Sequence, residues 1–106
     1  MIDPAIGWVT RIDGEPAAVV GIDGAVLVDG EQAWNITLLV APTKGQSPRL
    51  VKTTTADAQL TPSARPKSVL IPVAEWLGTR RYRDSNHTAI TNATLTLLGL
   101  PPRSPQ

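Results

Sequence analysis

Short runs of strand-forming residues, separated by Asp-Gly pairs, fill the first forty positions of the chain. The pairs are Asp13-Gly14, Asp23-Gly24 and Asp29-Gly30, and this dipeptide tolerates the positive φ angles that a tight hairpin turn requires. The runs before and between the pairs are rich in Val, Ile and Ala: Gly7–Ile12, Ala17–Ile22 and Ala25–Val28. The pattern predicts a meander of short strands with a hairpin turn at each Asp-Gly pair.

The segment from Ala33 to Val40 shows the clearest alternation of apolar and polar residues. One face of the predicted strand carries Trp34, Ile36, Leu38 and Val40, and the other carries Asn35, Thr37 and Leu39. Successive side chains of a strand point to opposite faces. A leucine among the polar residues therefore indicates that a helix or another subunit covers part of this second face.

Two stretches beyond this strand are expected to be loops. Residues 42–48 contain two prolines and a glycine, which favour a loop, and a strand is expected to resume at Arg49–Thr55. The second stretch, Ala56–Lys67, contains two more prolines. Structureless stretches of that length in compact domains are usually functional or disordered. We therefore expect Ala56–Lys67 to be an arm that reaches a partner.

The apolar run Ser68–Val73 predicts another strand. Its Pro72 confines that strand to a sheet edge, a bulge or a strand end, because proline lacks the donor that a ladder needs. Residues 74–77 are expected to add one helical turn before Gly78.

The end of the chain predicts a helix from Ser85 or Asn86 to about Leu98. Three apolar side chains fall on one helical face, and Gly99, followed by a leucine and two prolines, is a typical helix stop. The alternative is a strand, because Thr94–Leu97 alternates and threonine is a poor helix former.

These elements predict a mainly β domain over residues 1–100: a small barrel or sandwich of five to seven short strands with one C-terminal helix. An extended, Pro-rich tail is expected over residues 101–106. The chain has 106 residues, 42% of them hydrophobic, and no cysteine. It is long enough for one domain but has no disulfide, so its own packing or oligomerisation must stabilise it. We expect Trp8, Trp34 and Trp76 to anchor the core.

Charge is segregated along the chain. Residues 1–43 carry one basic and six acidic residues, a net charge of −5, whereas residues 44–106 carry nine basic and three acidic residues, a net charge of +6. Three interpretations stay open. In the first, the segregation has no function, because Asp is common in turns and Arg and Lys are common in exposed loops. In the second, the acidic hairpins of one copy contact the basic loops of the next. In the third, the basic half binds a polyanion.

The candidate interaction residues lie in the basic half. The run Arg80–Arg83 interleaves Tyr82 with cations, a pattern that contacts phosphates and stacks on rings. Arg and Tyr are also enriched in protein interfaces, and the plainest alternative is a solvated loop before a helix. The predicted interaction set is Arg65, Lys67, Arg80, Arg81, Tyr82 and Arg83.

The sequence contains no recognisable catalytic set. His87 is the only imidazole, and its place at a predicted helix start is typical of a solvated capping residue. Nucleophile-elbow and phosphate-loop motifs are absent, and the chain has too few His and Cys residues for a zinc site. Turn chemistry explains the neighbouring carboxylates Asp13 with Glu15 and Asp29 with Glu31, the alternative being an acid–base pair or a magnesium site. We expect no enzymatic activity and no cofactor or metal.

In its small size, β-rich pattern, long Thr- and Pro-rich loops and segregated charge, the chain resembles the small structural proteins of tailed bacteriophage virions. That class includes head–tail connector, tail and capsid-decoration components. The resemblance, which is one of size and composition, implies a non-enzymatic assembly protein that self-associates or docks on partner subunits through charged hairpins and long loops. Such a protein is made in the cytoplasm and incorporated into the virion.

The alternative function is a small regulatory or inhibitory module. It would bind nucleic acid or a host protein through the basic C-terminal half. Neither interpretation requires a small-molecule substrate. We expect no membrane association either, because no apolar stretch approaches the roughly 20 residues of a membrane span.

Overall fold

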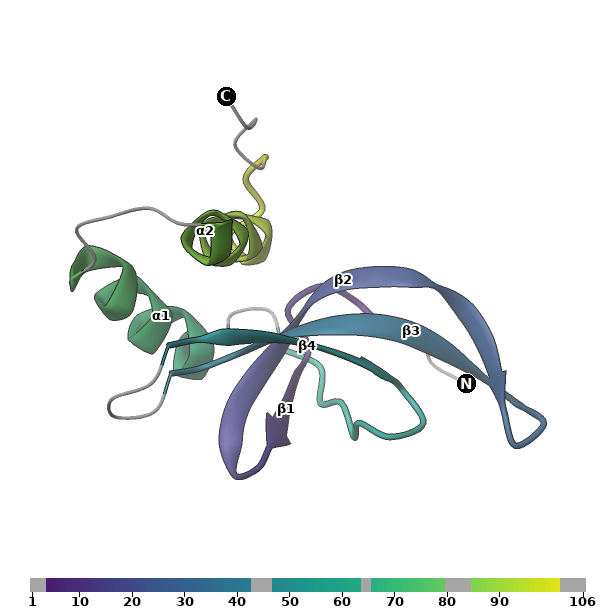
Figure 1. Cartoon of the computed structure of the whole chain (residues 1–106). Helices are drawn as coiled ribbons and strands as arrows, with labels where there is room; N and C mark the ends of the chain where they lie inside the picture. Colours follow the sequence, from purple (N-terminus) through teal and green to yellow (C-terminus); the bar gives the residue numbers. More distant parts are fainter. Residues whose placement is uncertain (1–3, 43–46, 64–65, 80–84, 102–106) are drawn as a thin grey trace.

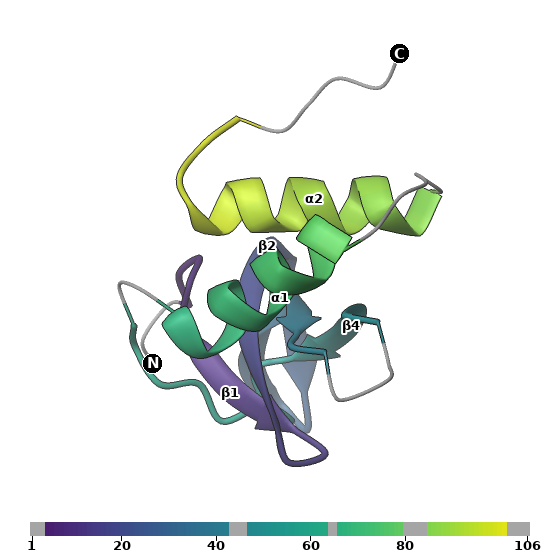
Figure 2. The same ribbon diagram turned by 90° about the vertical axis from the view of Figure 1, so that its left-hand side faces the viewer.

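A curved sheet of four antiparallel strands forms the centre of the molecule, and two helices pack on one of its faces (Figures 1 and 2). The computed structural model describes residues 4–42, 47–63, 66–79 and 85–101. Each strand pairs with its neighbour in sequence, in the order β1-β2-β3-β4. The elements are β1 (Val9–Ile12), β2 (Glu15–Val28), β3 (Glu31–Val40), β4 (Arg49–Thr54), α1 (Lys67–Thr79) and α2 (Ser85–Leu97).

The chain is mainly β, as expected, but the described residues do not form the predicted barrel or sandwich. They make four strands rather than five to seven, in one open sheet, with two helices rather than one. Two expected strands merge into β2, a strand of 14 residues. Asp23-Gly24 lies inside it, at a shift of the pairing register between Ile22 and Gly24. A bulge exploits the same glycine freedom as a hairpin turn, so this dipeptide alone does not distinguish the two.

The other two Asp-Gly pairs are confirmed as two-residue hairpin turns. Asp13 and Asp29 both have φ 51°, and the glycines that follow them have φ 83° and 81°. The flanking residues pair directly, Ile12 with Glu15 and Val28 with Glu31. Positive φ at both central positions gives a turn that matches the right-handed twist of the strands. The two turns therefore set the register of β1, β2 and β3.

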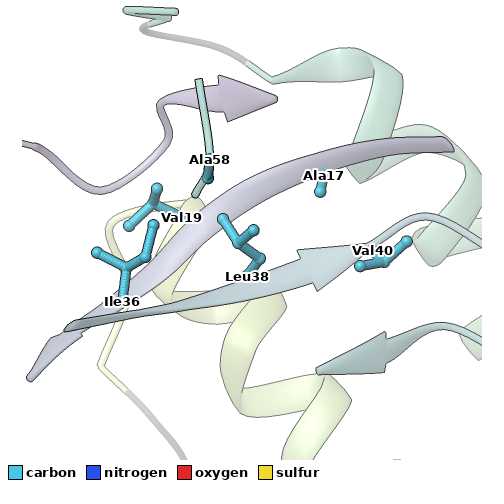
Figure 3. Close-up of a cluster of buried hydrophobic side chains, with 6 residues drawn as sticks. All are labelled: Ala17, Val19, Ile36, Leu38, Val40 and Ala58. Atoms are coloured by element: carbon cyan, nitrogen blue, oxygen red, sulfur yellow. The ribbon is translucent and has the colours of Figure 1, made fainter. Parts of the chain in front are cut away.

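One face of the sheet buries the cluster that the alternation in β3 predicts. Figure 3 shows this cluster, which we call the loop-side cluster: Ala17, Val19, Ile36, Leu38, Val40 and Ala58. The first five residues come from β2 and β3, whereas Ala58 comes from the chain after β4. Trp8 and Trp34 pack against the cluster, which confirms that these tryptophans support the core.

The opposite face buries a second cluster under the helices. This helix-side cluster contains Ala18, Leu39, Val69, Val73, Ile90 and Ala93. Leu39 has no exposed surface and packs with side chains of both α1 and α2. The expectation that the face of Leu39 is covered is confirmed, and the cover is the chain's own helices. Trp76 also packs here, as expected of a core tryptophan.

The chain after β4 is not the arm that its composition suggested. Ala58 is buried and Leu60 packs against the loop-side cluster. Thr61 exchanges two backbone hydrogen bonds with Val9: the Val9 N–H donates to the Thr61 carbonyl at 2.9 Å, and the Thr61 N–H donates to the Val9 carbonyl at 2.8 Å. The segment covers an apolar sheet face that water would otherwise contact, so packing holds it without regular structure.

The strand expected at Ser68–Val73 is wrong, because these residues belong to α1. Pro72 lies inside the helix and has no backbone N–H, so the Ser68 carbonyl loses the helical hydrogen bond that it would otherwise accept. Val69 and Val73 are fully buried against the sheet. Burial of this face outweighs the weak helix propensity of valine and the cost of the proline. β4, in contrast, confirms the strand expected after the first predicted loop. Residues 43–46 of that loop lie outside the described residues.

The C-terminal helix is confirmed, and the alternative strand is wrong. Gly99 has φ 76°, its N–H donates to the Thr96 carbonyl at 3.1 Å, and the Leu100 N–H donates to the Leu95 carbonyl at 2.9 Å. This pair of bonds is the Schellman motif. The helix accommodates its buried Thr94 because the Thr94 hydroxyl donates to the Ile90 carbonyl at 2.9 Å, one turn earlier, so this polar group has a partner.

Replacing Leu39 tests whether the helices cover the sheet. Leu39→Ala should lower the free energy of unfolding by about 3 kcal/mol, because it leaves a cavity between β3 and the helices. The matched control is Ile71→Ala, on α1 but 55% exposed, which should change this free energy by less than about 0.5 kcal/mol. Chemical denaturation measures both values, and equal values would contradict the covered face.

Two helical glycines should respond to alanine with opposite signs. Gly99→Ala should lower the free energy of unfolding by about 1 kcal/mol, because alanine is strained in the left-handed conformation. Gly78 lies in the last turn of α1, and a Cβ added there meets no atom within 4 Å. Gly78→Ala should therefore stabilise, by up to about 1 kcal/mol. Thermal unfolding of the two variants tests this; the same sign for both would rule out the cap.

Candidate interaction surface

The turn end of the β2–β3 hairpin extends beyond both neighbouring strands. β1 pairs with β2 only over Glu15–Ala18, and β4 pairs with β3 only from Asn35 onward. The remaining part, which we call the distal hairpin, comprises residues 24–35 and arches away from the two helices (Figure 1). Within the described ranges no strand flanks Gly24–Val28 on its side away from β3.

Beyond the bulge at Asp23-Gly24, the free edge of β2 lacks, within the described residues, the devices that normally protect an edge strand. Natural edges are blunted by bulges, prolines, lysines or a covering segment. The register shifts of β2 lie between Val19 and Gly21 and between Ile22 and Gly24, so Gly24–Val28 itself is regularly paired and carries no charge and no proline. Leu27, in this stretch, is 73% exposed. An exposed leucine is ordinary by itself, but beside unpaired backbone groups it marks a surface suited to another strand.

Charge distinguishes the distal edge of β2 from the outer edge of β4. The sequence has no Lys or Arg from Ile12 to Val40, and the distal hairpin carries the exposed carboxylates of Asp29 and Glu31. β4 is an edge strand, because it pairs only with β3 in the described part of the chain. β4 carries Arg49 and Lys52 and no carboxylate. The distal hairpin is therefore acidic, although Gly24–Val28 itself is uncharged, and the edge of β4 is basic.

An ion pair at the β4 edge leaves the charge of Arg49 available to a partner. A guanidinium nitrogen of Arg49 lies 3.4 Å from a carboxylate oxygen of Asp13, with side chains 41% and 84% exposed. Exposed pairs of this kind contribute no more than about 1 kcal/mol. A partner with a better-placed carboxylate would compete with Asp13 for this arginine.

A cavity of about 400 Å³ lies between the distal hairpin, the residues before β1 and the chain after β4. The hydroxyl of Thr55, in its wall, accepts the backbone N–H of Trp34 at 3.0 Å. This bond, together with the Thr55 N–H donated to the Trp34 carbonyl at 3.0 Å, ties the chain after β4 to the base of the distal hairpin. The lining residues are Pro4, Trp8, Val28, Glu31, Gln32, Ala33, Thr55, Ala56, Ala58, Leu60 and Pro62.

The residues predicted to form the interaction site are not brought together by the described structure. Lys67 is the first residue of α1, and it is exposed. The other five lie outside the described residues, so their role stays a prediction: Arg65, Arg80, Arg81, Tyr82 and Arg83. The distal edge of β2 cannot be recognised in the sequence, because the Asp-Gly pair at 23–24 is equally typical of a turn.

The carboxylates beside the turns are placed as turn chemistry requires. Asp13 and Asp29 both occupy the positive-φ position of a hairpin turn, and Glu15 and Glu31 each begin the next strand. In the part of the chain that the structure describes, no three Asp, Glu or His residues are grouped closely enough to hold a metal ion.

The comparisons with known proteins assign no relative. Protein-family models, curated proteins and solved structures all gave no significant match. Neither described helix is both long and apolar enough to cross a bilayer.

Proposed function

We propose that this chain is a structural assembly protein that docks head to tail on further copies of itself. In each contact, Gly24–Val28 of one copy lies along β4 of the next. The observation that carries the proposal is the unprotected edge Gly24–Val28, which projects beyond its neighbours and exposes Leu27. Strand addition at such an edge satisfies the unpaired backbone groups and contributes apolar contacts from alternate side chains.

Charge complementarity favours β4 as the partner edge. β4 offers six residues with Arg49 and Lys52, whereas the distal hairpin carries Asp29 and Glu31 and no cation. Contact between two distal hairpins would bring like charges together, which costs binding energy and suppresses that arrangement. A contact between two different surfaces is heterologous, so it closes into a ring or continues as a filament.

Ring and filament assembly is the behaviour that a resemblance to virion components implies. A connector, tail or decoration protein repeats one contact many times, so a single complementary pair of surfaces suffices. Incorporation into a virion is part of this proposal. The second candidate function, binding of nucleic acid or a host protein, depends on Arg80–Arg83 and remains a prediction from the sequence.

A lysine at the exposed end of the edge should prevent assembly. In Leu27→Lys, an apolar contact is replaced by a cation that faces the basic β4 edge, so the oligomer should become a monomer at equal concentration. Ile71→Lys is the matched control, because Ile71 is 55% exposed but lies on α1; its mass should equal that of the unaltered chain. Light scattering on a sizing column gives the masses, and high salt should shift the unaltered chain towards monomer.

Two results would overturn the proposed function. One is an unaltered chain that is monomeric at low salt and high concentration. The other is a Leu27→Lys variant that keeps the mass of the unaltered chain. Lys52→Glu provides a second test at the other side of the contact, since it should also lower the mass.

A further inference from the structure

The cavity beneath the distal hairpin has walls suited to a proline-rich peptide. Trp8, Leu60 and Pro62 give it an apolar, aromatic surface, and Glu31 is the only charged residue among the described residues that line it. Its volume of about 400 Å³ lies within the usual range for ligand pockets, about 300–1,000 Å³. Proline-rich segments bind in aromatic-lined grooves in the polyproline II conformation, which costs little entropy because it is preformed.

The backbone around Trp8 holds this wall in position. The Trp8 N–H donates to the Ala5 carbonyl at 3.2 Å, and the Trp8 carbonyl accepts the Val19 N–H at 2.8 Å. The indole also packs against the loop-side cluster. A wall fixed in this way is preorganised, so little binding energy is lost in ordering it.

We propose that this cavity binds residues 101–106 of a second copy of the chain. This segment has the sequence Pro-Pro-Arg-Ser-Pro-Gln, so half of its residues are prolines and Arg103 is its only charge. The prolines fit the apolar walls, and Arg103 pairs with Glu31 at the rim. The choice of a second copy as the source of the segment rests on the proposed self-association.

A neighbouring copy is the source that the fold favours. α2 lies on one face of the sheet (Figure 2) and contributes to the helix-side cluster. The loop-side cluster, whose Ala58 also lines the cavity, is on the opposite face. The five residues after Pro101 span at most about 16 Å in the polyproline II conformation. A segment in the same chain would have to pass around the sheet edge to reach the cavity. In a head-to-tail assembly, each copy offers one such segment and one cavity.

The direct test is a titration of the full chain, diluted until it is monomeric so that no neighbouring copy fills the cavity, with a labelled, N-acetylated peptide of residues 101–106. Fluorescence anisotropy should show saturable binding, and indole fluorescence should change as the peptide covers Trp8. Two control peptides separate the two parts of the recognition: one carries Arg103→Glu, and the other has all three prolines replaced by alanine. Each should bind about tenfold more weakly, which corresponds to about 1.4 kcal/mol.

Variants of the chain then locate the site. Glu31→Lys should weaken binding of the natural peptide and strengthen binding of the Arg103→Glu peptide. Glu75→Lys is the matched control, because Glu75 is an exposed carboxylate on α1. Reversing its charge should leave the affinities for both peptides unchanged. Ala56→Leu, at an exposed position of the cavity wall, should weaken the binding of all three peptides, because the larger side chain narrows the cavity.

Three results would overturn the inference: no saturable binding, equal affinity for all three peptides, or equal effects of Glu31→Lys and Glu75→Lys. The anisotropy titration does not require assembly, so it separates the two proposals. If Leu27 controls the mass but no peptide binds, the cavity assignment is wrong and the proposed function stands. If the peptide binds but the unaltered chain is monomeric, the second copy is wrong as its source, and so is the proposed function.

Discussion

The rest of the structure depends on one constraint: the C-terminal half of β3 is apolar on both faces. Leu38 and Leu39, neighbours in sequence, point to opposite sides, and neither has any exposed surface. A sheet with two apolar faces is stable in water only if both are covered. The chain after β4 covers one face and the two helices cover the other, which explains why a segment without regular structure is held in place and why a helix containing Pro72 persists.

The segments that cover the two faces of the sheet end before β2 and β3 do. β2 and β3 continue past β1 and β4 to the turn at Asp29-Gly30, and there the buried clusters give way to an open edge, exposed carboxylates and a cavity. The surface proposed for assembly is thus the part of the sheet that the chain's own elements do not complete. A second copy that supplies a strand would extend the same antiparallel pairing that organises the single chain.

Local patterns predicted the local features correctly. Alternation in β3 indicated both buried faces, two Asp-Gly pairs gave hairpin turns, and Gly99 gave the helix end. The predictions that were wrong concern segments whose structure is decided by packing against residues distant in sequence. Ser68–Val73 is strand-like by composition, yet Val69 and Val73, with Trp76 and Leu77, have the spacing of a helical face that the sheet buries. The open edge of β2 follows from where β1 and β4 end, which no local pattern records, and most of the predicted interaction residues lie outside the described structure.

The central claim is that the backbone of Gly24–Val28 is unpaired on one side in the single chain and paired in the assembly. Amide hydrogen exchange, compared between a concentrated sample and one diluted to monomer, tests this most directly. The account predicts that in the concentrated sample exchange slows at alternate residues of Gly24–Val28 and of β4, while Leu38 and Leu39 are unchanged. Identical exchange of Gly24–Val28 in both samples, although the mass has changed, would contradict it.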